Sequence, residues 1–241
     1  MGIDICRAHT VSLNETHELR LVTGVNRNPV VSKKSGLEIK CVYRRTKHGD
    51  HERDGNPFIY ALKGKRPYSI TSKELFRFRP SFKQIIHKMD IQTEVNFVLG
   101  MPSSHNVVTH FGNRVARKLG ATYIDDYFAK QKIGDILANF DITAVHKNHK
   151  KAVNNVLSKY EKLDPEQEIS LKKIRNNIRH YFEPVKLNPS YENLEPNGHI
   201  LLVDDLLSTG TTLLSAERLL KSQGACVQSA FCLLSDLTTR K

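Results

Sequence analysis

Tryptophan is absent from the 241-residue chain, cysteine occurs only four times, and no apolar run approaches the length of a membrane-spanning helix. The cysteines show neither a Cys-x-x-Cys pair nor the spacing of a zinc site. The first residues, Met1 to Arg7, lack the apolar core of a signal peptide. We therefore expect a cytoplasmic protein with free thiols and no membrane association.

Two common nucleotide-binding signatures are also missing. The chain contains no GxxxxGK[ST] phosphate loop and no GxGxxG dinucleotide fingerprint, which argues against a P-loop nucleotide hydrolase and a dinucleotide-dependent enzyme. Its histidine pairs, such as His146 and His149, have no third ligand at metal-site spacing. The sequence thus indicates no histidine-bound metal.

Negative charge is scarce, because 25 acidic residues face 37 lysines and arginines and leave a formal net charge of +12. A net charge of this sign attracts phosphate-rich molecules. Net charge alone does not identify the molecule, so two alternatives stay open. In the first, the positive charge attracts small anionic substrates such as nucleotides. In the second, basic faces of the protein bind a DNA or RNA partner.

The most informative segment is His199–Leu213, in which an apolar stretch ends in Asp204 and Asp205. The turn that follows supplies hydroxyl donors and one glycine that lets the backbone approach an anion: Ser208, Thr209, Gly210, Thr211 and Thr212. An amphipathic helix starting near Thr211 adds free N–H groups and the positive end of its dipole. The pattern predicts a strand–loop–helix phosphate cradle. Its two carboxylates are available for sugar hydroxyls, directly or through a divalent cation.

The segment Ile200–Thr212 resembles the signature of type I phosphoribosyltransferases, which bind phosphoribosyl diphosphate (PRPP). It has four apolar residues, an acidic pair, two apolar residues and Ser-Thr-Gly-Thr-Thr. The resemblance implies an α/β fold with a Rossmann-like core around a central parallel sheet. It also implies that Asp204 and Asp205 hold the ribose and Mg²⁺, the metal directly or through water and PRPP, and that Ser208–Thr212 bind the 5′-phosphate.

A second strand–loop–helix unit is predicted upstream. Residues 95–99 read as a buried strand, and a helix follows Asn106 and ends at Gly120. The unit resembles the pyrophosphate-loop unit of the same family. The resemblance implies pyrophosphate binding by the loop residues Pro102, Ser103, Ser104, His105 and Asn106.

A charged region at about residues 129–195 is expected to be a helical insertion. Its segment Leu171–Phe182 predicts a basic helix, and residues 177–182 resemble a segment of the competence-protein (ComF-like) phosphoribosyltransferases, the group most similar to this chain. The resemblance implies that Arg175 binds pyrophosphate and that Asn177 and Arg179 act in catalysis by closing over the leaving group. A solvated basic helix face is the alternative.

Residues 1–88 are expected to form an α+β extension, followed by a phosphoribosyltransferase domain at 89–241. Within the extension, Phe58–Leu62 and Tyr68–Ile70 read as two short strands. Thr71 opens a helix that breaks near Pro80. Since little chain follows the signature unit, the extension is the candidate for recognising the acceptor base or a partner.

The resemblance implies a homodimeric phosphoribosyltransferase that uses PRPP and Mg²⁺. It would transfer the 5-phosphoribosyl group to a nucleobase-like acceptor and release pyrophosphate. Two alternatives remain open. One is a sensor or regulator with this fold that works with nucleic acid in DNA uptake, transcription or phage defence. The other is a nucleotide-binding module with a dead site, against which the intact acids and hydroxyl loop argue.

Overall fold

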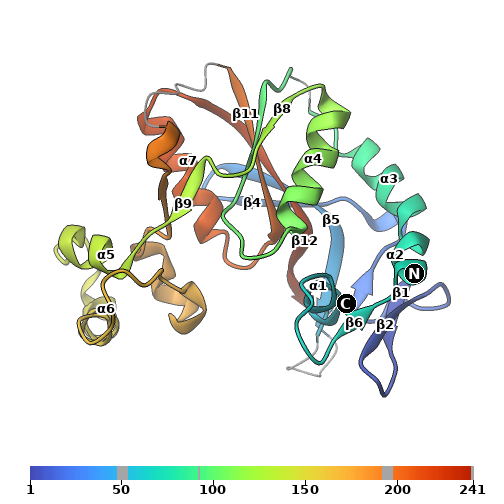
Figure 1. Ribbon diagram of the computed structural model, residues 1–241, viewed down its shortest axis with the longest axis horizontal. Helices are drawn as coiled ribbons and strands as arrows, with labels where there is room; N and C mark the ends of the chain where they lie inside the picture. The colour runs from blue at the N-terminus through green and yellow to red at the C-terminus, as the bar shows by residue number, and fades with distance from the viewer. Residues whose placement is uncertain (48–53, 92, 192–197, 240–241) are drawn as a thin grey trace.

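A seven-stranded sheet organises the computed structural model, which describes residues 1–47, 54–91, 93–191 and 198–239 (Figure 1). The strand order is β3-β5-β12-β11-β7-β8, and β4 pairs with β5. The strands are β3 (Leu21–Val22), β4 (Val30–Lys34), β5 (Leu37–Lys47), β7 (Phe97–Gly100), β8 (Thr122–Ile124), β11 (His199–Leu206) and β12 (Cys226–Thr239). All neighbours from β5 to β8 are parallel, which confirms the predicted α/β class.

Two helices cover opposite faces of the sheet and create two cores. α4 (Val107–Leu119) packs with Leu201 and Val203 of β11, whereas α7 (Thr211–Ser222) packs with Ile200 and Leu202. The alternation follows from the two-residue period of a strand. Burying each such side chain is worth roughly 1.5–3 kcal/mol, so the paired cores hold β11 rigidly at the centre.

The first 88 residues add a small sheet and three helices. The sheet has the order β1-β2-β6, with β1 (Gly2–Ile5), β2 (Thr10–Asn14) and β6 (Ser69–Ile70). The helices are α1 (Pro57–Leu62), α2 (Ser72–Arg77) and α3 (Arg79–Lys88), and a short 3₁₀ turn, η1, spans Val25–Arg27. The break before Pro80 and the strand at β6 are confirmed.

The strand predicted at Phe58–Leu62 is wrong, because this segment forms α1. Pro57 occupies the first helical turn, where its fixed φ suits a helix and its missing N–H costs nothing. Phe58 and Ile59 are buried in the core on the α4 side of the sheet, so tertiary packing favours the helix over the local strand propensity.

β5 was not expected, since its apolar run is interrupted by Lys40, Arg44 and Arg45. It nevertheless lies between β12 and the two antiparallel strands β3 and β4. The central sheet therefore takes strands from both sides of residue 88. The functional division of the chain at that residue stays a prediction.

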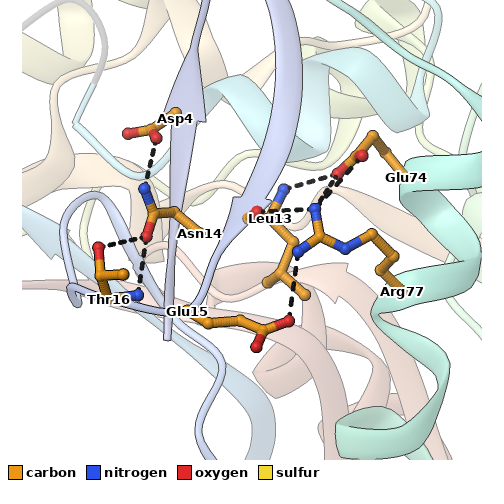
Figure 2. A network of polar contacts seen from close by, with 7 residues as sticks. All are labelled: Asp4, Leu13, Asn14, Glu15, Thr16, Glu74 and Arg77. Atoms are coloured by element: carbon orange, nitrogen blue, oxygen red, sulfur yellow. Dashed lines mark hydrogen bonds and ion pairs between the residues drawn. The ribbon is translucent and has the colours of Figure 1, made fainter.

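α2 is fastened to β2 by its polar side chains, as Figure 2 shows. Glu74 Oε2 accepts from the Leu13 N–H at 2.9 Å, and Arg77 Nη1 donates to the Leu13 carbonyl at 3.0 Å. Arg77 Nη2 also donates to Glu15 at 3.2 Å. α2 thus turns its charged side chains toward the strand, and its apolar Leu75 and Phe76 are exposed.

The insertion has a core of its own. It contains β9 (Phe128–Lys130), α5 (Ile133–Asn139), α6 (Lys147–Tyr160), the 3₁₀ turns η2 (Leu171–Lys173), η3 (Asn176–Tyr181) and η4 (Pro189–Tyr191), and β10 (Val185–Leu187), which pairs with β9. The helix predicted at Leu171–Phe182 is wrong, because Ile174 and Arg175 are extended and separate two 3₁₀ turns. This break lets both Ile174 and Ile178 enter the insertion core.

The N-terminal extension and the insertion flank the lower edge of the sheet in Figure 1, where the central parallel strands end. α1 and the small sheet lie on one side, and α5 and α6 lie on the other. Within the described ranges, no helix is both long and apolar enough to cross a membrane.

Candidate functional site

Asp204 and Asp205 lie at the carboxyl end of β11, the position at which parallel sheets bind ligands. The Asp205 side chain is almost fully buried, and its backbone N–H donates to Asp204 Oδ1 at 2.7 Å. Burial, with the adjacent Asp205 carboxylate, raises the pKa of Asp204. The pair is therefore held close, and one of its members resists ionisation.

Lys63 forms an ion pair with Asp205, and both side chains are largely buried. Lys63 is the residue that ends α1, and its N–H bonds to the Ile59 carbonyl at 3.0 Å. Through this ion pair, the N-terminal extension places the Lys63 ammonium group directly against the acid pair. The sequence signal for it was weak: a short basic turn after a segment that had been read as a strand.

Three further basic side chains act on the same place: Lys65, His105 and Lys172. Burial lowers the pKa of Lys172, and the nearby Lys65 and Lys63 ammonium groups lower it further. Burial, then Lys65 and Lys63, lower the pKa of His105. The extension and the insertion thus gather positive charge around one carboxylate, and the loop after β7 adds the His105 imidazole, which its lowered pKa keeps neutral at neutral pH. Such a concentration suits an anion with several charges.

The hydroxyl-rich loop has the backbone of an anion cradle. Gly210 has φ +82°, in the left-handed region, and α7 begins at the next residue without a side-chain cap. The first N–H groups of α7 are therefore directed toward the loop. The Thr209 and Thr211 hydroxyls are 2.9 Å apart, and Ser208 is exposed.

The side chain of Arg45, on β5, holds the start of this loop in place by hydrogen bonds. Its Nη2 donates to the Leu207 carbonyl at 2.6 Å, its Nη1 donates to Asn56 Oδ1 at 2.7 Å, and its Nε donates to the Ser235 carbonyl. Burial lowers the pKa of Arg45 to about 10, so the group stays charged at neutral pH. The sequence did not predict this role of Arg45, because an arginine among apolar residues gives no hint of its hydrogen-bond partners.

The second loop, after β7, reaches the same edge. β7 pairs with β11 from Phe97–Ile200 to Gly100–Val203, and the Met101 N–H bonds to the Val203 carbonyl at 2.9 Å. Pro102 and His105 are half-buried, while Ser103, Ser104 and Asn106 are exposed, and α4 starts at Val107 without a side-chain cap. The structure therefore brings together both predicted loops at neighbouring strand ends.

The three insertion residues assigned to catalysis and closure lie at the start of η3 or within it. Arg179 Nε donates to the Ile174 carbonyl at 2.8 Å, and Arg175 and Asn177 are exposed. Lys172 of the same segment lies near enough to Asp205 for the two charges to interact. The roles of Arg175, Asn177 and Arg179 remain predictions.

The acid pair is the part of the site that can hold a cation. No cluster of three or more His, Cys, Asp or Glu side chains suited to a metal occurs among the described residues. Mg²⁺ is commonly held by one or two carboxylates, with phosphate oxygens and water completing its octahedral shell. The carboxyl oxygens of Asp204 and Asp205 beside a phosphate cradle fit that chemistry, because a bound cation would favour the ionised form of Asp204.

The sequence and the fold were compared with known protein families and with solved structures. The family model of the phosphoribosyl transferase domain matches residues 111–241. Among solved structures, adenine phosphoribosyltransferase from Leishmania tarentolae is similar at 13% identity and a TM-score of 0.38, covering 97% of this chain and 94% of that one. A likeness this low carries no weight for function. No curated protein matches the chain.

Proposed function

Because this chain belongs to the phosphoribosyl transferase domain family, we propose that it is an enzyme that binds PRPP with Mg²⁺. It transfers the 5-phosphoribosyl group to a nucleobase-like acceptor and releases pyrophosphate. The observation that carries the proposal is the meeting of an acid pair, a left-handed glycine loop and a four-residue basic cluster at one edge of the parallel sheet.

In the proposed reaction, the bond between C1 of the ribose and the pyrophosphate oxygen breaks, and a nitrogen of the acceptor bonds to C1. Positive charge develops on the sugar ring as the leaving group departs with the electron pair. Catalysis of such a step consists of orientation and stabilisation of charge. Asp204 and Asp205 hold the ribose hydroxyls, and Ser208–Thr212 with the start of α7 bind the 5′-phosphate.

The leaving pyrophosphate gains negative charge, which Lys63, Lys65 and Lys172 are placed to stabilise, while His105 supplies a neutral hydrogen-bonding ring. This role adds residues from α1 and η2 to the predicted loop Pro102–Asn106. Lysine ammonium groups bind phosphate oxygens as compact point charges. Mg²⁺, held through Asp204, Asp205 and PRPP oxygens, supplies further charge neutralisation when bound.

The test is pyrophosphate release from PRPP and Mg²⁺ in the presence of adenine, guanine, hypoxanthine, uracil or orotate in turn. The proposal expects release with at least one base, and loss of release in the double variant Asp204→Asn, Asp205→Asn. Asp126→Asn is the matched control, because Asp126 follows strand β8 in another acidic pair that no hydroxyl-rich loop follows. Equal release by the double variant would contradict the assignment.

A regulator associated with nucleic acid is the second candidate, and the exposed lysines of α6 favour it: Lys147, Lys150 and Lys151. Phosphate contacts of this kind give an affinity that falls steeply with salt. A DNA or RNA duplex titrated at rising salt tests this candidate, with the triple Lys→Gln variant as control. The homodimer belongs to the proposal as well, and sedimentation equilibrium tests it.

A further inference from the structure

A second concave site lies on the face of the sheet that α4 covers. An open cavity of about 650 Å³ is bordered by α1, α2, α3 and α4, with Tyr43 and Leu233 of the sheet in its lining. Asp204, Asp205 and the loop Ser208–Thr212 do not line it. Its volume lies within the range of small-molecule sites, roughly 300–1,000 Å³. The cavity is therefore a binding site candidate separate from the acid pair.

Aromatic side chains dominate the lining. Phe58, Phe78, Phe82 and Phe111 form part of it, and Phe76 remains 64% exposed beside them. Phe76 is exposed because Glu74 and Arg77 hold α2 to β2 by its polar side (Figure 2). A flat apolar molecule would contact the exposed ring of Phe76 and the half-buried ring of Phe82, because the other rings of the lining are buried in the core.

Two arginines give the cavity its charge. The Arg79 guanidinium lies 5.6 Å from the Phe76 ring centre, and that of Arg114 lies 5.8 Å from the Phe82 ring centre. Both line the cavity, as does His110, and no carboxylate does so. Within the described part of the chain, neither arginine has an ion-pair partner. The cavity therefore offers two uncompensated positive charges on an apolar wall.

We propose that this cavity binds a small molecule with a flat apolar body and an anionic group, a carboxylate, sulfonate or phosphate. The rings receive the apolar body, and stacking on Phe76 and Phe82 holds the guanidinium groups in place to bind the anion bidentately.

The test uses 1-anilinonaphthalene-8-sulfonate, an aromatic sulfonate that fluoresces when bound, in titration of the intact protein. We expect saturable binding of one molecule per chain, weakened by at least about tenfold in Arg79→Met, Arg114→Met, since both charge-assisted contacts to the sulfonate are lost. Phe76→Ser should also weaken binding. Phe76 is exposed, so this variant keeps the fold, which thermal unfolding checks.

Three controls make the outcome decisive. Arg117→Met changes an exposed arginine of the same helix, which does not line the cavity, and should bind the dye as wild type does. The double variant Asp204→Asn, Asp205→Asn should bind the dye as wild type does, because neither residue lines the cavity. The neutral analogue N-phenyl-1-naphthylamine should bind more weakly. Absence of saturable binding, equal binding by the arginine variant, or weakened binding by the acid-pair variant would overturn the proposal.

Discussion

Lys63 and Asp205 connect the N-terminal extension to the acid pair through one ion pair between largely buried side chains. Lys63→Met leaves the buried Asp205 carboxylate without its partner. We expect a loss of about 3–5 kcal/mol in the free energy of unfolding. Urea unfolding measures it, and Lys63→Met combined with Asp205→Asn should recover most of the loss. Additive losses in the double variant would show that the two side chains are not coupled.

The raised pKa of Asp204 makes stability depend on pH in a definite direction. Between the ordinary aspartate value, about 4, and the raised one, the folded protein binds more protons at this site than the unfolded chain. Asp204 therefore makes the folded state less stable as pH rises through that window. Asp204→Asn removes this dependence and stabilises the protein at neutral pH. Unfolding curves from pH 5 to 8 should show a flatter profile for the variant, and an unchanged profile would contradict the account.

Gly210 sets the geometry of the loop between β11 and α7. Gly210→Ala forces a side chain into the left-handed region, at a cost of roughly 1–2 kcal/mol. The new Cβ would meet Lys34 Cγ at 3.5 Å, an ordinary contact, so the fold should survive. The strained backbone would also move the N–H groups at the start of α7 that the proposal assigns to the 5′-phosphate. We expect PRPP binding to weaken by more than the stability loss explains.

Gly224→Ala is the matched control for that variant. Gly224 has φ +79°, lies after α7 and has no atom within 4 Å of an added Cβ. Gly224→Ala therefore costs about the same backbone strain as Gly210→Ala. Gly224 follows the end of α7, whereas Gly210 precedes its start at the hydroxyl-rich loop. Equal weakening of PRPP binding by both variants would assign the effect to stability alone. Titration calorimetry with thermal unfolding of each variant separates the two.

The elements that the sequence predicted are the ones with a strong local signal. β7 with α4, and β11 with α7, each have an apolar strand, a polar turn and a helix of regular period. The elements that were missed depend on distant partners. β5 is a strand because β12 lies beside it, α1 is a helix because Phe58 packs into the core, and Ile174 is extended because the insertion core requires it.

In the candidate site, too, the residues that could be predicted are those with a local sequence pattern. The acid pair and the hydroxyl loop are contiguous in sequence, so their pattern was readable. Lys63, Arg45 and Lys172 reach the site from three other segments. No sequence period relates Arg45 to the Leu207 carbonyl, which lies 162 positions away along the chain. Contacts of this length follow from the assembled sheet alone.

The whole molecule depends on β5, which is inserted between β12 and the strands β3 and β4. A shortened chain that begins at residue 89 would lose all three strands and leave β12 as an unpaired edge. We expect it to aggregate or to unfold without cooperativity, as circular dichroism and size-exclusion chromatography would show. A monomeric, cooperatively folded chain of residues 89–241 would instead establish the division at residue 88 as a domain boundary.

Calorimetric titration of PRPP with Mg²⁺ tests the central claim most directly, that the edge of the sheet at β11 is a PRPP site. The account predicts saturable binding by the wild type, no detectable binding by Asp204→Asn, Asp205→Asn, and unchanged binding by Asp126→Asn. Absence of binding by the wild type, or equal binding by the double variant, would contradict it.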